Sequence, residues 1–294
     1  MLVVASLGLA ACGTSVQKTL KGALASVGAQ QYLQVHLSAS VAGTGASAAQ
    51  AAQVQKVLSL VSMTMTEQNT TGSAISASAG KVNEEVTLDV GSSPLLDLVQ
   101  VGQNLYVKVD FSAASSIPDL GSTASELTGL QLLLGGRWFE VPSTLLSSYL
   151  PAKDKSASQT ARQHAIEERV VDALTALVEK TKYTTVSGGF SQTGTLQAVA
   201  DALAPVMAQA SSTAVSSPGK VAGTYHIALS LSGSTATGAQ IGITAPNANK
   251  GDMSVSVSAT IAHQSTAVVA PSPVTVITPQ LIKSLSGAAG GSTL

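Results

Sequence analysis

Apolar and polar residues alternate along several stretches of the chain, which is the pattern of half-buried strands. The clearest stretch is Met253–Ile261, where apolar residues alternate with three serines and one threonine. The same alternation predicts further strands over residues 32–41, 63–68, 82–90, 95–101, 105–111, 137–141, 183–188, 225–231, 241–243 and 273–277. An apolar face opposite a hydroxyl-bearing face indicates an antiparallel sheet with one face in solvent.

Apolar residues at helical spacing predict a second kind of element. They indicate helices over residues 118–134, 158–180 and 195–209, and a short one over 278–285. Pro205 falls inside the third helix and is expected to kink it. Residues 43–52 fit either a loop or the start of a helix, and residues 13–30 fit a tether with a first helical turn.

The order of these elements predicts the fold class. Strands come first, helices lie in the middle and strands return, which is typical of an α+β fold with helices on one face of an antiparallel sheet. Because no long linker divides the chain, we expect one domain over residues 31–285 and a tail over 286–294. Residues 95–111 predict a hairpin whose turn, Gly102-Gln103-Asn104, is longer than the tight two-residue kind.

Composition excludes several classes of function. Only 11% of the residues are charged and the net charge is −1, which gives no electrostatic basis for binding nucleic acid. Aromatic residues make up 3%, too few for a stacking platform, whereas hydrophobic residues make up 45% and suffice for a large core. After the start of the chain, no stretch has the uninterrupted apolar length of a membrane helix.

The single cysteine, Cys12, follows a short apolar run over residues 2–11. That run is too short to span a bilayer but suits the hydrophobic part of an export signal. Leu9-Ala10-Ala11-Cys12 resembles the lipobox of bacterial lipoprotein signal peptides, although no Lys or Arg precedes the run. The resemblance implies cleavage after residue 11, a diacylglyceryl group on the Cys12 sulfur, and a lipidated tether over residues 12–30. The alternative is an ordinary buried thiol.

The sequence contains no recognisable catalytic motif. Three Ser-x-x-Lys spacings occur, but none has the companion motifs of penicillin-binding enzymes, and chance matches are expected in a serine-rich chain. The four histidines have no metal-ligand spacing, and His36, His226 and His263 are expected to be exposed on the polar sides of strands. We therefore expect no catalytic, metal or cofactor site and no enzyme. Trp138 is expected to anchor its strand, or to form the rim of a cavity.

Taken together, several segments resemble one family. The lipobox, "YLQVHLSASV", "VQVGQNLYVKVDF", "GGRWFEVP" and "PVTVITP" are similar to segments of the actinobacterial LppX/LprG-type lipoproteins, whose fold is related to the LolA/LolB lipoprotein carriers. The resemblance spans most of residues 30–285, through loose patterns of spacing. It implies a curved antiparallel half-barrel, with helices packed on its concave face and a cavity that holds acyl chains.

The resemblance also implies a function and a location. The expected protein is anchored by lipid to the extracytoplasmic face of the cell membrane and binds or shuttles a lipid or lipoglycan in its cavity. The alternative is a non-enzymatic structural or interaction lipoprotein of the envelope with a fully packed core. A protein partner is not identifiable. Plain core packing is the alternative for every candidate cavity-lining residue: Val86, Leu88, Val107, Val109, Leu174, Leu203, Val206, Val255 and Val257.

Overall fold

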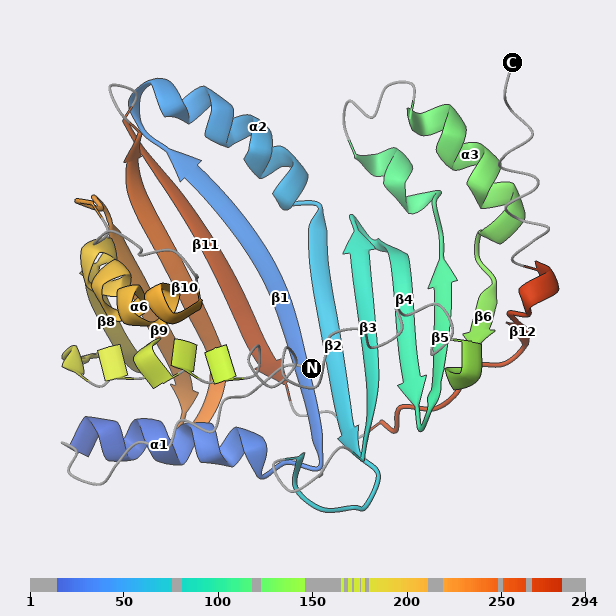
Figure 1. Cartoon of the computed structure of the whole chain (residues 1–294), viewed down its shortest axis with the longest axis horizontal. Helices are drawn as coiled ribbons and strands as arrows, with labels where there is room; N and C mark the ends of the chain where they lie inside the picture. The colour runs from blue at the N-terminus through green and yellow to red at the C-terminus, as the bar shows by residue number, and fades with distance from the viewer. Residues whose placement is uncertain are drawn as a thin grey trace. The chain divides into compact units, whose positions relative to one another are not determined.

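The computed structural model is a mixed α+β fold built on one open, mostly antiparallel sheet. Its twelve strands follow the order β12-β6-β5-β4-β3-β2-β1-β11-β10-β9-β8-β7 (Figure 1). Cys12, His164 and His263 lie outside the described residues. The structure describes residues 15–75, 81–117, 123–145, 165–210 (without 167–168, 171, 175 and 178–179), 219–247, 251–262 and 266–281.

The chain forms two compact units, which are described one at a time. The first comprises residues 1–30, 36–59 and 155–262, and the second comprises residues 31–35, 60–154 and 263–294. Strand β1 (Tyr32–Gly43) begins in the second unit and continues in the first.

The second unit is an antiparallel meander with one parallel edge strand. Strand β3 has the limits that the sequence predicts, and each of β2 to β6 pairs antiparallel with the next. The edge strand β12 runs parallel to β6. The elements of this unit are β2 (Val61–Asn69), β3 (Val82–Val90), β4 (Ser93–Val101), β5 (Asn104–Val109), the 3-10 helix η3 (Ala113–Ser116), α3 (Thr123–Leu134), β6 (Trp138–Val141) and β12 (Val274–Val276).

The hairpin between β4 and β5 confirms one prediction and corrects another. The two strands pair as expected, but the loop contains only Gly102 and Gln103, because Asn104 already pairs with Val101. The longer loop expected from the sequence is therefore wrong. Gly102 has a φ of 62°, which a tight turn requires and glycine adopts without strain. The Asn104 side chain donates a hydrogen bond to Glu140 Oε1 on β6 at 2.9 Å, which extends the sheet pairing up to the turn.

A small core holds one face of this meander. Val99, Tyr106 and Val268 are buried together, and partly buried Val101, Val274 and Trp138 pack against them. The Asn83 side chain donates to the backbone oxygen of Val268 at 3.2 Å, while the Val268 N–H donates to Gln68 Oε1 at 2.8 Å. These contacts tie the segment before β12 to β2 and β3. Trp138 thus packs as expected of a strand anchor.

The first unit combines β1 with a second group of antiparallel strands. Strand β8 pairs with β7 and β9, and β10 pairs with β9 and β11. The described residues between 165 and 180 are helical, as the sequence predicts. The other elements are α1 (Ser15–Gly28), α2 (Ala48–Leu58), β7 (Thr184–Val186), β8 (Gly189–Thr195), α6 (Leu196–Ala210), β9 (Thr224–Ser232), β10 (Thr235–Asn247) and β11 (Gly251–Ala262).

Two elements of this unit, α1 and β8, differ from the sequence-based expectation, and α2 agrees with one of the two alternatives for residues 43–52, the start of a helix. The segment expected to be a tether with one helical turn is the helix α1, which packs against β10 and buries Ala23 and Val27. Residues 43–52 lead into a helix, α2, whose buried Ala51 approaches Gly43. The sequence gives no sign of β8, because Phe190 is the only large apolar residue in that strand.

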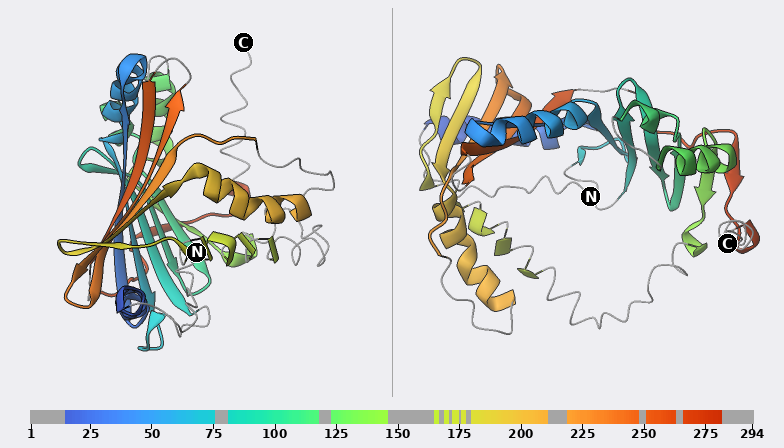
Figure 2. Two further views of the ribbon diagram at one scale, coloured as in Figure 1. Left: turned by 90° about the vertical axis from the view of Figure 1, so that its left-hand side faces the viewer. Right: turned by 90° about the horizontal axis from the view of Figure 1, so that it is seen from above.

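Helix α6 follows β8 directly and extends away from one side of the strands of this unit (Figure 2). Its start is capped, since the Thr195 hydroxyl accepts a hydrogen bond from the Ala198 N–H at 3.2 Å. A second hydrogen bond stabilises the N-terminus of this helix, because the Leu196 N–H donates to the Gly223 backbone oxygen at 3.0 Å. Pro205 lies within the helix.

Candidate functional site

One face of the first unit carries three rows of side chains across strands β8 to β11. In an antiparallel sheet, residues directly opposite each other point to the same face. The register therefore places these residues side by side on one face. The rows are Phe190–Leu229–Ala239–Ala259, Gln192–Ile227–Ile241–Val257 and Gly194–Tyr225–Ile243–Val255.

The part of this face on β8 and β9 is buried. Phe190, Gln192, Tyr225 and Leu229 are each less than a tenth exposed. Thr181 follows the described helical residues between 165 and 180 and covers this part. Its hydroxyl lies 3.4 Å from Tyr225 Oη, and its backbone oxygen accepts a hydrogen bond from Gln192 Nε2 at 3.1 Å. Burial, together with the neighbouring Tyr225, raises the pKa of Tyr183 to about 12.

The part of the same face on β10 and β11 is exposed. Ile241 and Ile243 are 54% and 46% exposed, and Val255 and Val257 are each 45% exposed. The register pairs Ile241 with Val257 and Ile243 with Val255, so the four branched side chains form one continuous group, here called the β10–β11 patch. Isolated exposed apolar residues need no explanation, but a contiguous group indicates a contact surface.

The burial of the valines and serines on the two faces of β11 is the reverse of what the sequence predicts. The alternation predicts that the valines are buried and the serines exposed, yet Ser254, Ser256 and Ser258 are half-buried while Val255 and Val257 are exposed. Polar side chains on this hydroxyl-bearing face form hydrogen bonds with one another. Gln240 Nε2 donates to Ser256 Oγ at 2.9 Å, and Thr244 Oγ1 lies 2.8 Å from Ser254 Oγ.

The predicted cavity-lining residues of this unit therefore fall into two groups. Val255 and Val257 belong to the exposed β10–β11 patch. On the helices, Val206 is buried, Leu203 is half-buried and Leu174 is exposed. Ile241 and Ile243 are members of the patch that the candidate residues omitted. The predicted strand over residues 241–243 was short, but the alternation of Ile241 and Ile243 could have placed both residues on the apolar face.

The second unit has an apolar face of its own. Its register joins Val86, Leu98 and Val107 in one row and Leu88, Leu96 and Val109 in the next. Met65 and Met63 on β2 continue these rows. The structure thus brings together the predicted residues Val86, Leu88, Val107 and Val109 on one face, where all four are half-buried.

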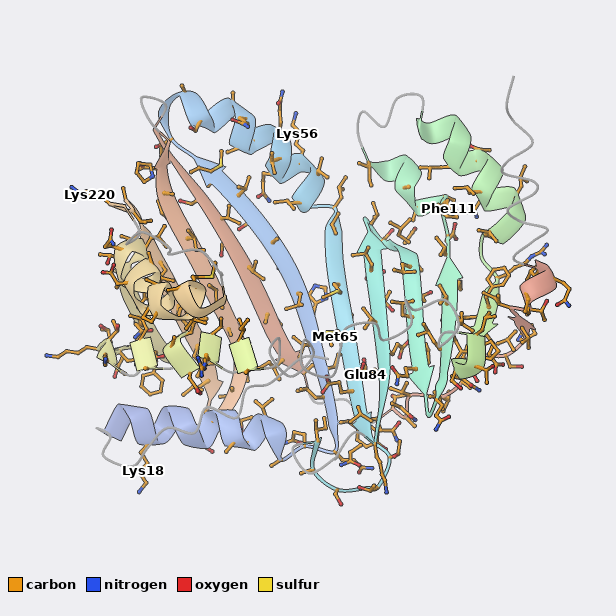
Figure 3. All side chains as sticks on the ribbon, viewed as in Figure 1. Lys18, Lys56, Met65, Glu84, Phe111 and Lys220 are labelled. Atoms are coloured by element: carbon orange, nitrogen blue, oxygen red, sulfur yellow. The ribbon has the colours of Figure 1, made fainter. Side chains whose placement is uncertain are left out.

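Two carboxylates extend this apolar face by one further row. Glu67 lies next to Met65 along the face of β2 and pairs with Glu84 on β3, which lies next to Val86. Figure 3 labels Met65 and Glu84 on these two neighbouring strands. Burial raises the pKa of the Glu67 carboxyl, and the Glu84 charge adds to the effect. Neither Glu67 nor Glu84 was among the site residues predicted from the sequence. The signal that could have found it is Glu67 at an inward position of an alternating strand.

The other face of the same strands carries a charge cluster. Lys108 Nζ lies 3.1 Å from Asp97 Oδ2 and 5.7 Å from the centre of the Trp138 ring. Burial raises the pKa of Glu85, and the Asp97 charge raises it further. Here a lysine balances the acidic side chains, whereas Glu67 and Glu84 face the opposite side.

Two other features are absent from the part of the chain that the structure describes. No three His, Cys, Asp or Glu residues in this part of the chain are grouped as metal ligands. None of the helices described is long and apolar enough to cross a membrane. His36 and His226 are exposed, as expected.

No protein-family model matches the chain, and no curated protein matches it.

Proposed function

We propose that this protein is a lipid-anchored lipoprotein of the extracytoplasmic membrane face that binds or carries a lipid or lipoglycan by hydrophobic contact. We further propose that its sheet forms an LppX/LprG-like half-barrel, with helices on the concave side. The observation that carries the proposal is the incomplete cover of the first unit's apolar face: it is buried on β8 and β9, but exposed at Ile241, Ile243, Val255 and Val257.

The exposed patch supports binding of hydrocarbon for a simple energetic reason. Removing apolar surface from water contributes about 25 cal/mol per Å², or about 0.8 kcal/mol for each buried CH₂ group. Covering about ten methylene groups would contribute roughly 8 kcal/mol before the cost of ordering the ligand is subtracted. Small and branched side chains offer no chemistry beyond this contact, which favours sequestration over bond cleavage.

The lipid anchor is the second part of the proposal. Cys12 in its lipobox would carry the acyl groups, and two acyl chains give stable attachment whereas one gives only marginal binding. A body held at the membrane surface can exchange lipid with the bilayer beside it.

Displacement of a fluorescent fatty acid tests the binding site. The full chain carrying Cys12→Ala, which cannot be acylated, is compared with a variant in which Ile241, Ile243, Val255 and Val257 are all replaced by threonine. Threonine keeps the branched shape and the strand preference but removes apolar surface. The proposal expects the affinity to fall about tenfold or more, since the loss of roughly two methyl groups' worth of contact suffices for that change.

A matched control keeps this experiment decisive. Gln240 on β10 and His226 on the neighbouring strand β9 lie exposed on the opposite face, so Gln240→Thr/His226→Thr changes this sheet without touching the patch. The control is expected to bind like the parent. Equal affinity of all three proteins would overturn the patch as the binding surface.

The structural alternative, an interaction lipoprotein with a packed core, has one observation in its favour. Val206, Tyr225 and Leu229 are buried, so part of the space between helices and sheet in the first unit is filled. A protein that binds none of the fatty-acid probe would support this alternative.

A further inference from the structure

The exposed part of the apolar face in the first unit has a limited length. The β10–β11 patch occupies two successive rows of this face. The rows on either side of it, Ala239–Ala259 and Ala245–Met253, are half-buried. On the β9 side, Tyr225 is buried. The exposed branched side chains therefore end after two rows along the strands.

The length of the patch follows from strand geometry. Each residue on one face of a strand occupies about 7 Å of strand length, because residues advance roughly 3.4 Å and alternate between the two faces. The two rows therefore offer about 14 Å of apolar surface along β10 and β11. An extended hydrocarbon chain advances roughly 1.3 Å per carbon, given a carbon–carbon bond of about 1.5 Å, so the patch matches about ten carbons.

The face that carries the patch is also free of charged side chains on strands β8 to β11. In these four strands, all of whose residues the structure describes, the acidic, basic and histidine side chains are Asp252 and His226 alone. The register pairs Asp252 with Pro246 and His226 with Gly242, which places both side chains on the opposite face. The uncharged surface is complementary to hydrocarbon and offers no counter-ion to a head group.

The exposed area is too small for a protein partner. About half of each of the four side chains is exposed. A whole aromatic side chain buries about 150–250 Å², so four half-exposed and smaller side chains present at most roughly 300 Å². A stable interface takes about 800 Å² from each partner. A single hydrocarbon chain is therefore the occupant that fits the patch.

We propose that the β10–β11 patch binds one hydrocarbon chain over a length of about ten carbons, laid along the two strands, and that further carbons make no additional contact. This inference rests on the proposed function, because it names the class of chain that the same patch takes. The fitting ligand is a single-chain amphiphile of medium length, whose head group stays in solvent.

Competition with saturated fatty acids of increasing length tests the proposal. The full chain carrying Cys12→Ala is loaded with a fluorescent fatty acid, which is displaced by hexanoate, octanoate, decanoate, dodecanoate or hexadecanoate, each below its micelle-forming concentration. From hexanoate to decanoate we expect the affinity to rise about two- to fourfold for each added methylene group. From dodecanoate to hexadecanoate it should change by less than about twofold, since the added carbons lie beyond the exposed rows.

Removal of one row should shorten the chain that the patch accepts. Ile243→Thr/Val255→Thr leaves about 7 Å of apolar surface, so the affinity is expected to stop rising about five carbons earlier. In this variant octanoate, decanoate and dodecanoate should bind equally well, within about twofold. Ile241→Thr/Val257→Thr is expected to have the same effect, because it removes a row of equal length. If one variant lacks the far-ultraviolet circular dichroism of the parent, the other decides.

The control variant changes the opposite face. Gln240→Thr/His226→Thr leaves both rows of the patch intact and is expected to keep the parent's dependence on chain length.

The outcomes separate the two proposals. An affinity that keeps rising from dodecanoate to hexadecanoate, or a row variant that keeps the parent's dependence on chain length, overturns the proposed length but leaves the proposed function standing. Failure of the probe and of every fatty acid to bind the parent overturns the proposed function as well.

Discussion

Ile241 on β10 and Val257 on β11 are direct cross-strand partners, and both side chains are exposed although they belong to the apolar face of their sheet. In the same row, Gln192 on β8 is fully buried. The cover on this face therefore ends between β9 and β10, within a single row of side chains. This boundary separates the buried residues of the face on β8 and β9 from the exposed residues on β10 and β11.

Substitution on either side of the boundary should change stability by different amounts. Leu229→Ala removes a buried side chain and is expected to lower the free energy of unfolding by about 2–5 kcal/mol. Ile241→Ala removes an exposed side chain of similar size and is expected to cost roughly 1 kcal/mol or less. Urea unfolding followed by circular dichroism measures both. Equal losses would show that the patch is part of the core.

Gly223 should tolerate no side chain. Its φ is 121°, and an added Cβ would approach the Thr244 oxygen on β10 and Leu196 Cδ1 on α6. Gly223→Ala is expected to lower the free energy of unfolding by about 1–3 kcal/mol, through backbone strain and steric overlap. Gly219→Ala is the control, because a Cβ there meets nothing within 4 Å. The interpretation fails if the two variants unfold at the same urea concentration.

The alternating strands were predictable because a period of two is visible wherever one face is apolar. This signal placed β3 at its observed limits and identified β1, β4, β5, β9 and β11. Strand β8 was not predictable, since Gly189, Gly194 and polar residues occupy most of it and its burial depends on Phe190 and Gln192 meeting Leu229 and Ile227 on β9. The turn at Gly102 was misjudged because the sequence does not reveal that Asn104 pairs within the sheet.

The sequence predicted which residues share an apolar face, but it did not predict which of them are exposed to solvent. Periodicity placed Val255 and Val257 on an apolar face, and Val86 and Val107 on another. Periodicity cannot state how far a helix reaches across that face, which is why the exposed valines and half-buried serines of β11 reversed the expectation. Glu67 was overlooked because a single acidic residue at an inward strand position follows no motif.

The stability of the protein should depend on pH through Glu67. Burial and the Glu84 charge raise the pKa of this carboxyl above its usual value of 4.5. The folded protein therefore holds the proton more tightly than the unfolded chain, and the stabilisation is complete below about pH 4.5 and is lost as the pH rises through the folded-state pKa. Glu67→Gln is expected to unfold at higher urea concentration than the parent at pH 8.

The matched comparison is made at pH 4. There the parent carboxyl is largely protonated, so the advantage of Glu67→Gln at pH 8 should shrink. An advantage of the same size at both pH values would mean that ionisation of Glu67 does not limit stability.

Cys12 should carry the acyl groups of the proposed anchor. A bacterial cell that expresses the chain and is fed an alkyne analogue of palmitate is expected to label the protein, and Cys12→Ala should abolish the label because the chain has no second cysteine. Cys12→Ala should also move the protein from the membrane pellet to the soluble fraction. Labelling that persists in the variant would contradict the anchor.

Native mass spectrometry of the Cys12→Ala chain, purified from bacterial cells without detergent, tests the central claim most directly. The protein is expected to carry one lipid per chain, released by organic solvent, and the variant with threonine at Ile241, Ile243, Val255 and Val257 should carry less. A parent protein that is free of lipid, and stays free after incubation with a total membrane-lipid extract, would contradict the claim.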